Sequence, residues 1–376
     1  MKKKNPKSVH VLIACGGTGG HLFPGIAVGE VLASRGHDVT LLISEKKIDA
    51  LAASGHKELR FEKMPFLAMP KLWSPKMFGF LKGLWQGAKA CRRIIRDHDV
   101  KVVLGMGGFT SFAPLYAGRK EGCRTLIHES NAIPGKANRL NAKFSDIVLC
   151  GLDACREHFP KHGDVRVVGT PIRGSMRQQN GDDPQEFFKL DKDRRTLLVM
   201  GGSQGARGVN RAVGQALDQF EKMGIQVLHI AGPADYEEVR DVYAKIPMLK
   251  QHVAAFCHRM DLAYRAADLA VARSGASSMS ELAYFGVPSL LVPYPYAAED
   301  HQTRNAEIFD KAGAGRLIRE NDLNAETLAD AVRGIVNDAR VAGGMKKAAQ
   351  KLAVRNSAEK IADLIVKEAE KAGEDG

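Results

Sequence analysis

Two glycine-rich segments have the composition of a phosphate-binding loop, and each follows a short apolar run. Residues 16–20 read GGTGG after the apolar residues 9–14, and residues 201–205 read GGSQG after residues 196–200. Glycine allows a tight turn between a strand and a helix, in which backbone N–H groups and the helix N-terminus face an anion. Such a turn needs glycine even without a ligand, so one loop would be weak evidence. Two such loops, one in each half of the chain, favour a diphosphate or an acceptor that is bound by both halves.

The first loop departs from the dinucleotide-binding fingerprint. Gly17 and Gly19 have its initial spacing, but its third glycine position holds Leu22, which disfavours a nicotinamide-dependent enzyme. His21 follows the loop directly. An imidazole there could act as a general base, because its pKa suits proton removal near neutral pH. A histidine that only caps the turn is the alternative.

Three further residues offer contacts to an anion or a sugar. Ser203 adds a hydroxyl donor to the second loop, and Arg173 ends the first half of the chain. Glu281 lies in a short helix that the serine-rich segment 274–280 is expected to cap and that Gly286 should end. The Glu281 carboxylate could accept two hydrogen bonds from a ribose diol, or it could be an ordinary exposed helix residue.

The elements that must position these residues alternate between short apolar runs and amphipathic stretches, as in parallel α/β sheets. The polar residues 173–195 are predicted to be a linker, after which the pattern restarts. We therefore predict two similar doubly wound domains. The expected elements are strands at 9–14, 39–43, 101–105, 125–128, 147–150, 196–200 and 226–231, and helices at 24–34 and 210–222.

Composition limits the class of protein and its partners. A chain of 376 residues is long enough for two cores. Its formal charge of +12 implies an anionic partner, and no nucleic-acid motif accompanies that charge. The six cysteines have no metal-ligand spacing, so we expect reduced structural thiols. No apolar run approaches the roughly 18–20 residues of a spanning helix, and the N-terminus lacks a signal-peptide core, so a cytosolic protein is expected.

One basic segment has the composition of a membrane-binding surface. Residues 64–96 contain seven Lys or Arg, no acidic residue and both tryptophans, Trp73 and Trp85. Phe78 and Phe80 lie between them. Interleaved aromatic and basic residues suit an anionic bilayer interface. A core helix with solvated lysines is the alternative.

Five motifs occur together in a specific order. They are GGTGGH at 16–21, HESN at 128–131, GGSQGA at 201–206, RSGA at 273–276 followed by Glu281, and His301-Gln302 before Asn305-Ala306. In this combination the chain resembles the bacterial N-acetylglucosaminyltransferases of peptidoglycan synthesis, in glycosyltransferase family 28. The resemblance extends from about residue 9 to about residue 355.

The resemblance implies a GT-B fold, with two Rossmann-like doubly wound parallel-sheet domains facing across a cleft. The expected division is an acceptor and membrane-binding domain at 1–173, a donor domain at 174–341, and a C-terminal helix at 342–376 that packs back on the first domain. The implied enzyme is an inverting hexosyltransferase that moves GlcNAc from UDP-GlcNAc to the MurNAc 4-hydroxyl of lipid I, giving lipid II and UDP for cell-wall synthesis. It would act as a peripheral protein on the cytoplasmic face of the inner membrane, where cell shape and division depend on its product.

The resemblance also assigns roles residue by residue. His21 would be the general base, Arg173 and Ser203 would contact the diphosphate, Glu281 the ribose, Gln302 the sugar, and the backbone of Cys257 the uracil. No cofactor is expected, since UDP-GlcNAc is a co-substrate, and no metal, because no DxD-like acidic pair lies in a loop suited to Mg²⁺–diphosphate binding. The full set of implied substrate-binding residues is Thr18, Gly19, Gly20, Asn131, Arg173, Ser203, Cys257, Ala276, Ser277, Ser278, Met279, Ser280, Glu281 and Gln302.

Three other functions remain open at the level of sequence. A diacylglycerol or sterol glycosyltransferase would share the fold and differ in acceptor. A UDP-sugar epimerase on the same frame would consume the donor without an acceptor. A non-catalytic nucleotide-binding protein is disfavoured by the presence of His21, Glu281 and Gln302.

Overall fold

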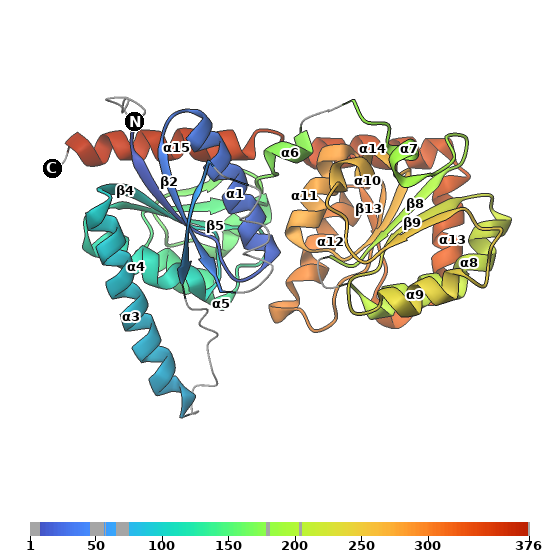
Figure 1. The fold of residues 1–376 in the computed structure, drawn as a ribbon, viewed down its shortest axis with the longest axis horizontal. Coiled ribbons are helices and arrows are strands. Elements are labelled where there is room, and N and C mark those ends of the chain that lie inside the picture. The colour runs from blue at the N-terminus through green and yellow to red at the C-terminus, as the bar shows by residue number, and fades with distance from the viewer. Residues whose placement is uncertain are drawn as a thin grey trace. The chain divides into compact units, whose positions relative to one another are not determined.

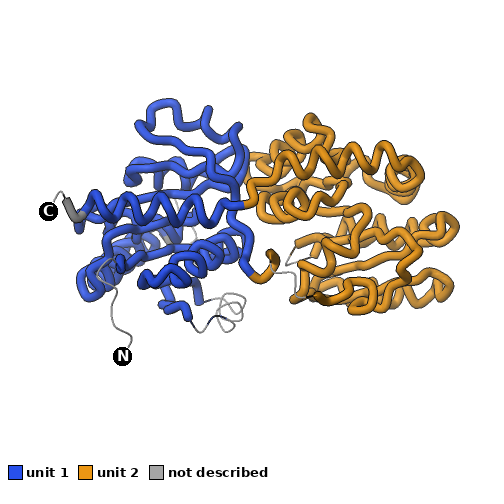
Figure 2. The backbone as a smooth tube through the Cα atoms, turned by 90° about the horizontal axis from the view of Figure 1, so that it is seen from above, with its two compact units in different colours: residues 1–174, 356–376 blue, residues 175–355 orange. Residues whose placement is uncertain are grey.

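The computed structural model describes residues 8–45, 56, 58–64, 75–177, 181–202 and 205–374. The chain divides into two compact units (Figure 2). Unit 1 contains residues 1–174 and 356–376, and unit 2 contains residues 175–355. Within the described ranges, no helix combines the length and the apolar character needed to span a bilayer.

Unit 1 is built on a sheet with helices packed against it (Figure 1). The sheet has seven strands, all paired in parallel, in the order β3-β2-β1-β4-β5-β6-β7. Its strands are β1 (His10–Ala14), β2 (Asp38–Ser44), β3 (Arg60–Met64), β4 (Val100–Gly105), β5 (Arg124–Glu129), β6 (Ile147–Cys150) and β7 (Val165–Val167). Its main helices are α1 (Gly19–Ser34), α3 (Lys76–Asp97), α4 (Phe112–Lys120), α5 (Lys136–Asn141) and α15 (Ser357–Glu374).

The alternation of side chains along β1 explains why both faces of this sheet are covered. Val11 and Ile13 belong to a core with α1 and α15, whereas Leu12 and Ala14 belong to a second core with α3 and α4. Successive strand residues point to opposite faces, so an unbroken apolar run requires helices on both sides. The sequence of β1 therefore specifies a three-layer unit.

The C-terminal helix α15 completes the first of these cores although it comes last in the chain. Ile361 and Ile365 are fully buried there, beside α1. The buried Glu368 accepts hydrogen bonds of 3.0 and 2.7 Å from Arg124 and one of 2.7 Å from Lys371. The segment expected to begin at residue 342 is divided in the structure: its first part continues in unit 2, and unit 1 resumes at residue 356.

Unit 2 repeats the design with a six-stranded parallel sheet in the order β10-β9-β8-β11-β12-β13. The strands are β8 (Thr196–Met200), β9 (Gln226–Ile230), β10 (Gln251–Ala254), β11 (Leu269–Ala272), β12 (Ser289–Leu291) and β13 (Gly315–Leu317). The helices, beginning with α6 at the boundary, are α6 (Gly174–Arg177), α7 (Pro184–Phe188), α8 (Arg207–Lys222), α9 (Tyr236–Tyr243), α10 (Met260–Ala266), α11 (Ala276–Phe285), α12 (His301–Lys311), α13 (Ala325–Val336) and α14 (Ala339–Leu352).

The order of the strands reverses once in each sheet, between β1 and β4 in unit 1 and between β8 and β11 in unit 2. In open parallel sheets, ligands bind outside the carboxyl ends of the strands at this reversal. Both glycine-rich segments follow strands at these points. The topology thus places each of them where a ligand would bind.

The predicted strands agree with the structure to within one residue at each end, but two other predictions were wrong. Residues 173–195 are not a plain linker, because they form α6 and α7, and Phe188 and Leu190 are buried. The serine-rich segment does not cap α11 through a side chain. Its N-cap residue is Gly275, and Ser277, Ser278 and Ser280 lie inside the helix.

A buried polar network joins α8, β9 and α9 in unit 2. Asn210 donates hydrogen bonds from Nδ2 to the carbonyl of Ala231 and to Asp235, so its Oδ1 accepts from Nε2–H of His229 at 3.0 Å. Nδ1 of His229 then accepts from the hydroxyl of Tyr243 at 3.0 Å. Burial lowers the pKa of His229 to about 3. The imidazole is therefore neutral in the folded protein.

The depressed pKa of His229 predicts acid destabilisation of unit 2. An unfolded histidine takes up a proton below about pH 6.5, whereas the folded one resists protonation until about pH 3. Stability should fall as the pH drops from 7 to 5, by about 2 kcal/mol from this residue alone. Urea unfolding of the wild type and of His229→Gln at both pH values measures this. The gap between the two proteins should narrow by about that amount at pH 5, and a gap that does not change with pH would contradict the assignment.

Candidate functional site

The loop between β1 and α1 forms the first cluster of predicted site residues. A Cβ at Gly16 would lie 2.4 Å from the nitrogen of Ser44, and Gly17 has φ of +114°. Both positions therefore require glycine. Thr18 is the extended N-cap of α1, and Gly19 and Gly20 form its first turn. The N-terminus of a helix carries a partial positive charge, so this turn is placed where an anion would be stabilised.

His21 lies on this first turn and faces a second glycine turn, after β4. Its Nδ1 is 3.4 Å from the Thr18 hydroxyl. A Cβ at Gly107 would come within 2.8 Å of its Nε2. The ring occupies space that only a glycine leaves open. Asn138 holds the same turn by accepting the N–H of Gly108 at 3.1 Å.

Glu129, at the end of β5, organises the residues around that turn. It is 4% exposed and accepts hydrogen bonds from the backbone and side chain of Asn131 (both 2.9 Å), from Nδ2 of Asn138 (2.8 Å) and from the N–H of Gly135 (3.3 Å). Burial raises the pKa of the Glu129 carboxyl, although these four hydrogen bonds act to lower it. The network fixes Asn131, a predicted contact, and links it through Asn138 to the turn beside His21.

Glu129, Asn138 and Gly107 also belong to this cluster, although they were not predicted from the sequence. A signal was available, because residues 105–108 (GMGG) repeat the strand-then-glycine pattern, and Glu129 ends an apolar strand within a motif already singled out. Its neighbour His128 is a structural residue. Burial lowers the pKa of His128 to about 4, and its Nε2–H donates to the carbonyl of Gly169 at 2.9 Å.

Arg173 and Gly174, where the first segment of unit 1 ends, contact α1 at Phe23 and Glu30. The guanidinium of Arg173 stacks on the ring of Phe23, with 4.2 Å between the guanidinium carbon and the ring centroid. Glu30 accepts the N–H of Gly174 at 3.0 Å. Arg173, predicted to contact a diphosphate, is thus held against α1 in unit 1.

The loop between β8 and α8 forms the corresponding turn in unit 2. A Cβ at Gly201 would lie 2.3 Å from the nitrogen of Ala206, and one at Gly205 would lie 2.3 Å from the carbonyl oxygen of Ala231. Gly205 is therefore packed directly on the end of β9, which the Asn210 network holds from behind. Ser203, the predicted hydroxyl donor, lies outside the described residues.

The loop between β11 and α11 brings Gln302 beside the N-terminus of α11. Ser274 donates from Oγ to the carbonyl of Gln302 at 2.8 Å, and Asn305 donates from Nδ2 to the carbonyl of Ser274 at 3.1 Å. The side-chain oxygen of Gln302 accepts the N–H of Tyr294 at 3.0 Å. The bonds of Ser274 join the loop before α11 to the start of α12.

The helical period divides the predicted binding segment 276–281 between the core and the surface. Ala276 and Met279 are buried, whereas Ser277, Ser278, Ser280 and Glu281 are partly exposed, so Met279 serves the core. The hydroxyl of Tyr264, on α10, donates to Oε2 of Glu281 at 2.7 Å. Tyr264 was not singled out from the sequence, since it meets Glu281 only through the packing of α10 on α11.

Cys257 lies between β10 and α10, partly buried beside the exposed ring of Phe256. Burial raises the pKa of its thiol, so the thiol stays protonated at neutral pH. A thiol in this state is inert. The structure is thus compatible with a backbone contact at this position and gives no role to the sulfur.

Comparison with known proteins identifies the family. Residues 11–150 match the N-terminal domain of glycosyltransferase family 28, and residues 196–364 match its C-terminal domain. The UDP-N-acetylglucosamine--N-acetylmuramyl-(pentapeptide) pyrophosphoryl-undecaprenol N-acetylglucosamine transferase of Geobacter sulfurreducens is 37% identical over 362 residues, covering 95% of this chain and 98% of that protein. The protein of the same name from Shewanella denitrificans is 35% identical over 382 residues, covering 98% and 99%.

Solved structures agree with this grouping. MurG of Acinetobacter baumannii superposes with a TM-score of 0.74 and 25% identity, over 96% of this chain and 99% of that one. UGT89C1 of Arabidopsis thaliana, at 16% identity and a TM-score of 0.70 over 96% and 99%, shares the fold alone. The prediction of a GT-B protein with two Rossmann-like domains is confirmed. The chain therefore belongs to glycosyltransferase family 28, the family that includes these N-acetylglucosamine transferases.

Proposed function

We propose that this enzyme transfers GlcNAc from UDP-GlcNAc to the 4-hydroxyl of the MurNAc in lipid I, with inversion at the anomeric carbon. The acceptor oxygen forms the new bond to C1, the bond from C1 to the β-phosphate oxygen breaks, and UDP leaves. The products are lipid II and UDP. The observation that carries the proposal is identity of 30–37% to transferases named for this reaction, over nearly the whole of both chains.

The donor-side roles rest on the geometry of unit 2. The N-terminus of α11 follows β11 and so lies at the carboxyl edge of the sheet, where a helix N-terminus stabilises a diphosphate. Glu281, oriented by Tyr264, is proposed to bind the ribose, and Gln302 the sugar. Ser203, the serines of α11 and the backbone of Cys257 complete the proposed donor site.

The acceptor-side roles rest on unit 1. Thr18, Gly19, Gly20 and Asn131 are proposed to bind lipid I, and His21 to take the proton from its hydroxyl. The ring of His21 is held by the Thr18 hydroxyl and by the glycine turn at 107–108. A base must be oriented as well as have a suitable pKa, and this packing supplies the orientation.

The transfer step is proposed to need no metal or other cofactor. Charge on the departing UDP would be met by loop N–H groups, helix N-termini and Arg173. The acidic sequence Asp191-Lys192-Asp193 precedes β8 and so lies at the amino end of that strand, away from the glycine turn. There Asp191 is paired with Arg194 and Lys250.

A direct test measures UDP release from UDP-GlcNAc by the purified protein, with and without a lipid I analogue, before and after exhaustive chelation. We expect release that depends on the acceptor, a product heavier by one GlcNAc, and full turnover after chelation. Donor turnover without acceptor would indicate an epimerase or hydrolase instead. Transfer to a diacylglycerol or sterol, and not to the lipid I analogue, would contradict the proposed acceptor.

The roles of His21 and Glu281 predict opposite kinetic signatures. His21→Ala should lower kcat by about 100-fold or more, the typical contribution of a general base, with donor binding unchanged. Glu281→Ala should raise KM for UDP-GlcNAc by about tenfold or more through the loss of charge-assisted hydrogen bonds. Steady-state kinetics with donor titration measures both, and near-normal turnover of His21→Ala with intact donor binding would remove His21 from its role.

A membrane surface on α3 is proposed as the place where the enzyme meets its lipid acceptor. Phe78, Leu81 and Trp85 are 84%, 56% and 67% exposed and recur at helical spacing. Lys89 lies over the Trp85 ring at 5.7 Å, and Lys82 is exposed nearby. Anionic lipids favour such a mixture of aromatic and basic side chains. The enzyme would then act peripherally on the cytoplasmic face of the membrane.

The structure corrects one member of that surface and leaves another undescribed. Phe80 is 8% exposed and packs edge-to-face on Phe109, with 5.9 Å between the ring centroids. It therefore belongs to the packing of α3 in unit 1. Trp73 lies outside the described residues.

Replacing Phe78, Leu81 and Trp85 together by serine should therefore weaken binding to anionic vesicles by at least about 30-fold, or about 2 kcal/mol, even if each side chain is only partly buried in the bilayer, because full burial would contribute about 1.5–3 kcal/mol for each. Vesicle co-sedimentation measures it. Met248→Ser is the matched control, because Met248 is 76% exposed in unit 2, and it should bind as the wild type does. Unchanged binding of the triple variant would contradict the proposal.

A further inference from the structure

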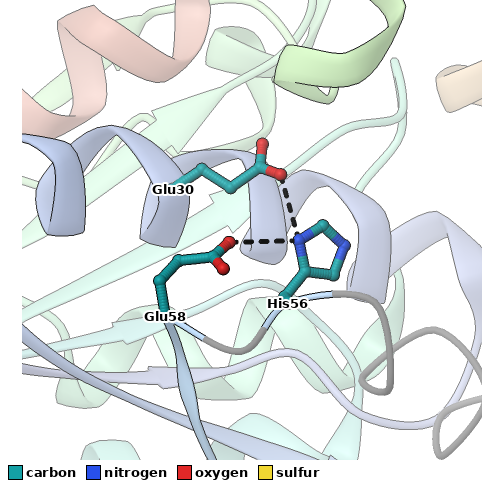
Figure 3. A group of neighbouring side chains, drawn as sticks. All are labelled: Glu30, His56 and Glu58. Atoms are coloured by element: carbon teal, nitrogen blue, oxygen red, sulfur yellow. Dashed lines mark ion pairs between the residues drawn. The ribbon is translucent and has the colours of Figure 1, made fainter.

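Two carboxylates and one imidazole converge on one point in unit 1, outside the proposed substrate sites. Oε1 of Glu30 lies 3.2 Å from Nδ1 of His56, and Oε1 of Glu58 lies 3.5 Å from the same nitrogen. Figure 3 shows the three side chains directed at one another from α1 and from the segment before β3. Within the described residues, this is the one group of at least three His, Cys, Asp or Glu side chains whose ligand atoms all lie within 4.8 Å.

Packing, rather than charge, brings the two segments together. Leu59, next to Glu58, is 6% exposed in the core of unit 1. A Cβ at Gly29, next to Glu30, would lie 3.5 Å from a methyl carbon of Leu59. The N–H of Leu59 donates to the carbonyl of His56 at 3.3 Å. The apolar contact therefore sets the separation of the three polar groups before any ligand binds.

The two carboxylates of this cluster carry more negative charge than its single imidazole can neutralise. Nδ1 of a histidine carries at most one hydrogen, yet two carboxylate oxygens approach it. The side chains of Glu30 and His56 are only 21% and 20% exposed, and that of Glu58 is 55% exposed. The second oxygen of Glu30 is occupied by the N–H of Gly174. This bond orients the carboxylate, as outer hydrogen bonds do for metal ligands.

We propose that Glu30, His56 and Glu58 bind a divalent transition-metal ion, with Zn²⁺ as the best match. Zinc binds nitrogen and carboxylate oxygen at about 2.0–2.2 Å in a tetrahedron, so neighbouring ligand atoms lie about 3.3–3.5 Å apart. The separations of 3.2 and 3.5 Å agree with this spacing. Three protein ligands leave a fourth position for water. Mg²⁺ prefers six oxygen ligands and fits this set poorly.

The ion would stabilise unit 1 and would take no part in the transfer. It would tie α1 to the segment before β3 and hold the carboxylate that accepts the N–H of Gly174, where the first segment of unit 1 ends. The site is therefore distinct from the proposed reaction, which needs no metal. Chelation should lower the melting temperature without stopping turnover.

Titration of the chelator-stripped full chain with ZnCl₂, followed by calorimetry, tests the site. His56→Ala should lose one bound ion per chain, or bind it at least about 100-fold more weakly, because removal of a ligand costs no less than loss of an outer-shell partner. Glu58→Gln should also bind Zn²⁺ more weakly.

Glu62→Gln is the matched control. Glu62 has the same charge and lies on β3, but it pairs with Arg60 at 2.8 Å. The affinity of Glu62→Gln for Zn²⁺ should stay within about twofold of the wild-type value. Zn²⁺ should raise the melting temperature of the wild type and of Glu62→Gln, but not that of His56→Ala.

Equal stoichiometry and affinity in the wild type and His56→Ala would overturn the proposal, since the ions would then bind elsewhere. Absence of zinc binding to the wild type would also overturn it and leave the three residues as an ion-pair cluster. If His56→Ala fails to fold, Glu58→Gln decides the matter, because a half-exposed side chain can be exchanged without loss of the core. Wild-type affinity in Glu58→Gln would then contradict the site.

Discussion

A Cβ atom at Gly16 would lie 2.4 Å from the backbone nitrogen of Ser44, and one at Gly201 would lie 2.3 Å from that of Ala206. Both distances are shorter than any stable contact, so only glycine lets the chain turn from the first strand of each unit into its first long helix. This close approach determines where the helix begins. It therefore also determines where the N-termini of α1 and α8 lie, at the edge of the sheet where the strand order reverses.

Each glycine turn is supported from behind by a buried polar network. In unit 1, Glu129 and Asn138 hold the turn next to His21, and in unit 2, Asn210 and His229 hold the end of β9 on which Gly205 packs. These side chains do not belong to the proposed substrate contacts. Their hydrogen bonds keep the contact residues in place, and this pre-organisation is what a substrate-binding loop requires.

The strands of both sheets could be predicted from the sequence because continuous apolar runs bounded by glycine and polar residues identify buried parallel strands. Gly286 likewise marked the end of α11, where it has positive φ. The internal structure of residues 173–195 could not be predicted in this way. Phe188 and Leu190 become buried only by packing on unit 2, and the polar composition of the segment conceals this.

The candidate site could be predicted only in part, for a similar reason. The motif residues are adjacent in sequence, so the pattern marks Thr18, Gly19, Gly20, His21 and Glu281. Their partners come from distant segments: Asn138 reaches Gly108, and Tyr264 reaches Glu281, through contacts between helices. The segment 276–281 is helical, so its side chains lie on different faces of α11. Met279 is buried in the core, whereas its neighbours Ser278 and Ser280 are partly exposed. A sequence pattern shows neither which distant residues come into contact nor which face of a helix is buried.

The central claim is that UDP-GlcNAc binds to unit 2, at the loop before α11, and that unit 1 holds the base. Amide hydrogen exchange of the full chain, with and without saturating UDP-GlcNAc, tests it most directly. We expect slower exchange in peptides that contain Cys257 and residues 273–281, with little change in residues 15–23 and 106–110. Slower exchange confined to those two segments of unit 1 would place the donor in the wrong unit and contradict the account.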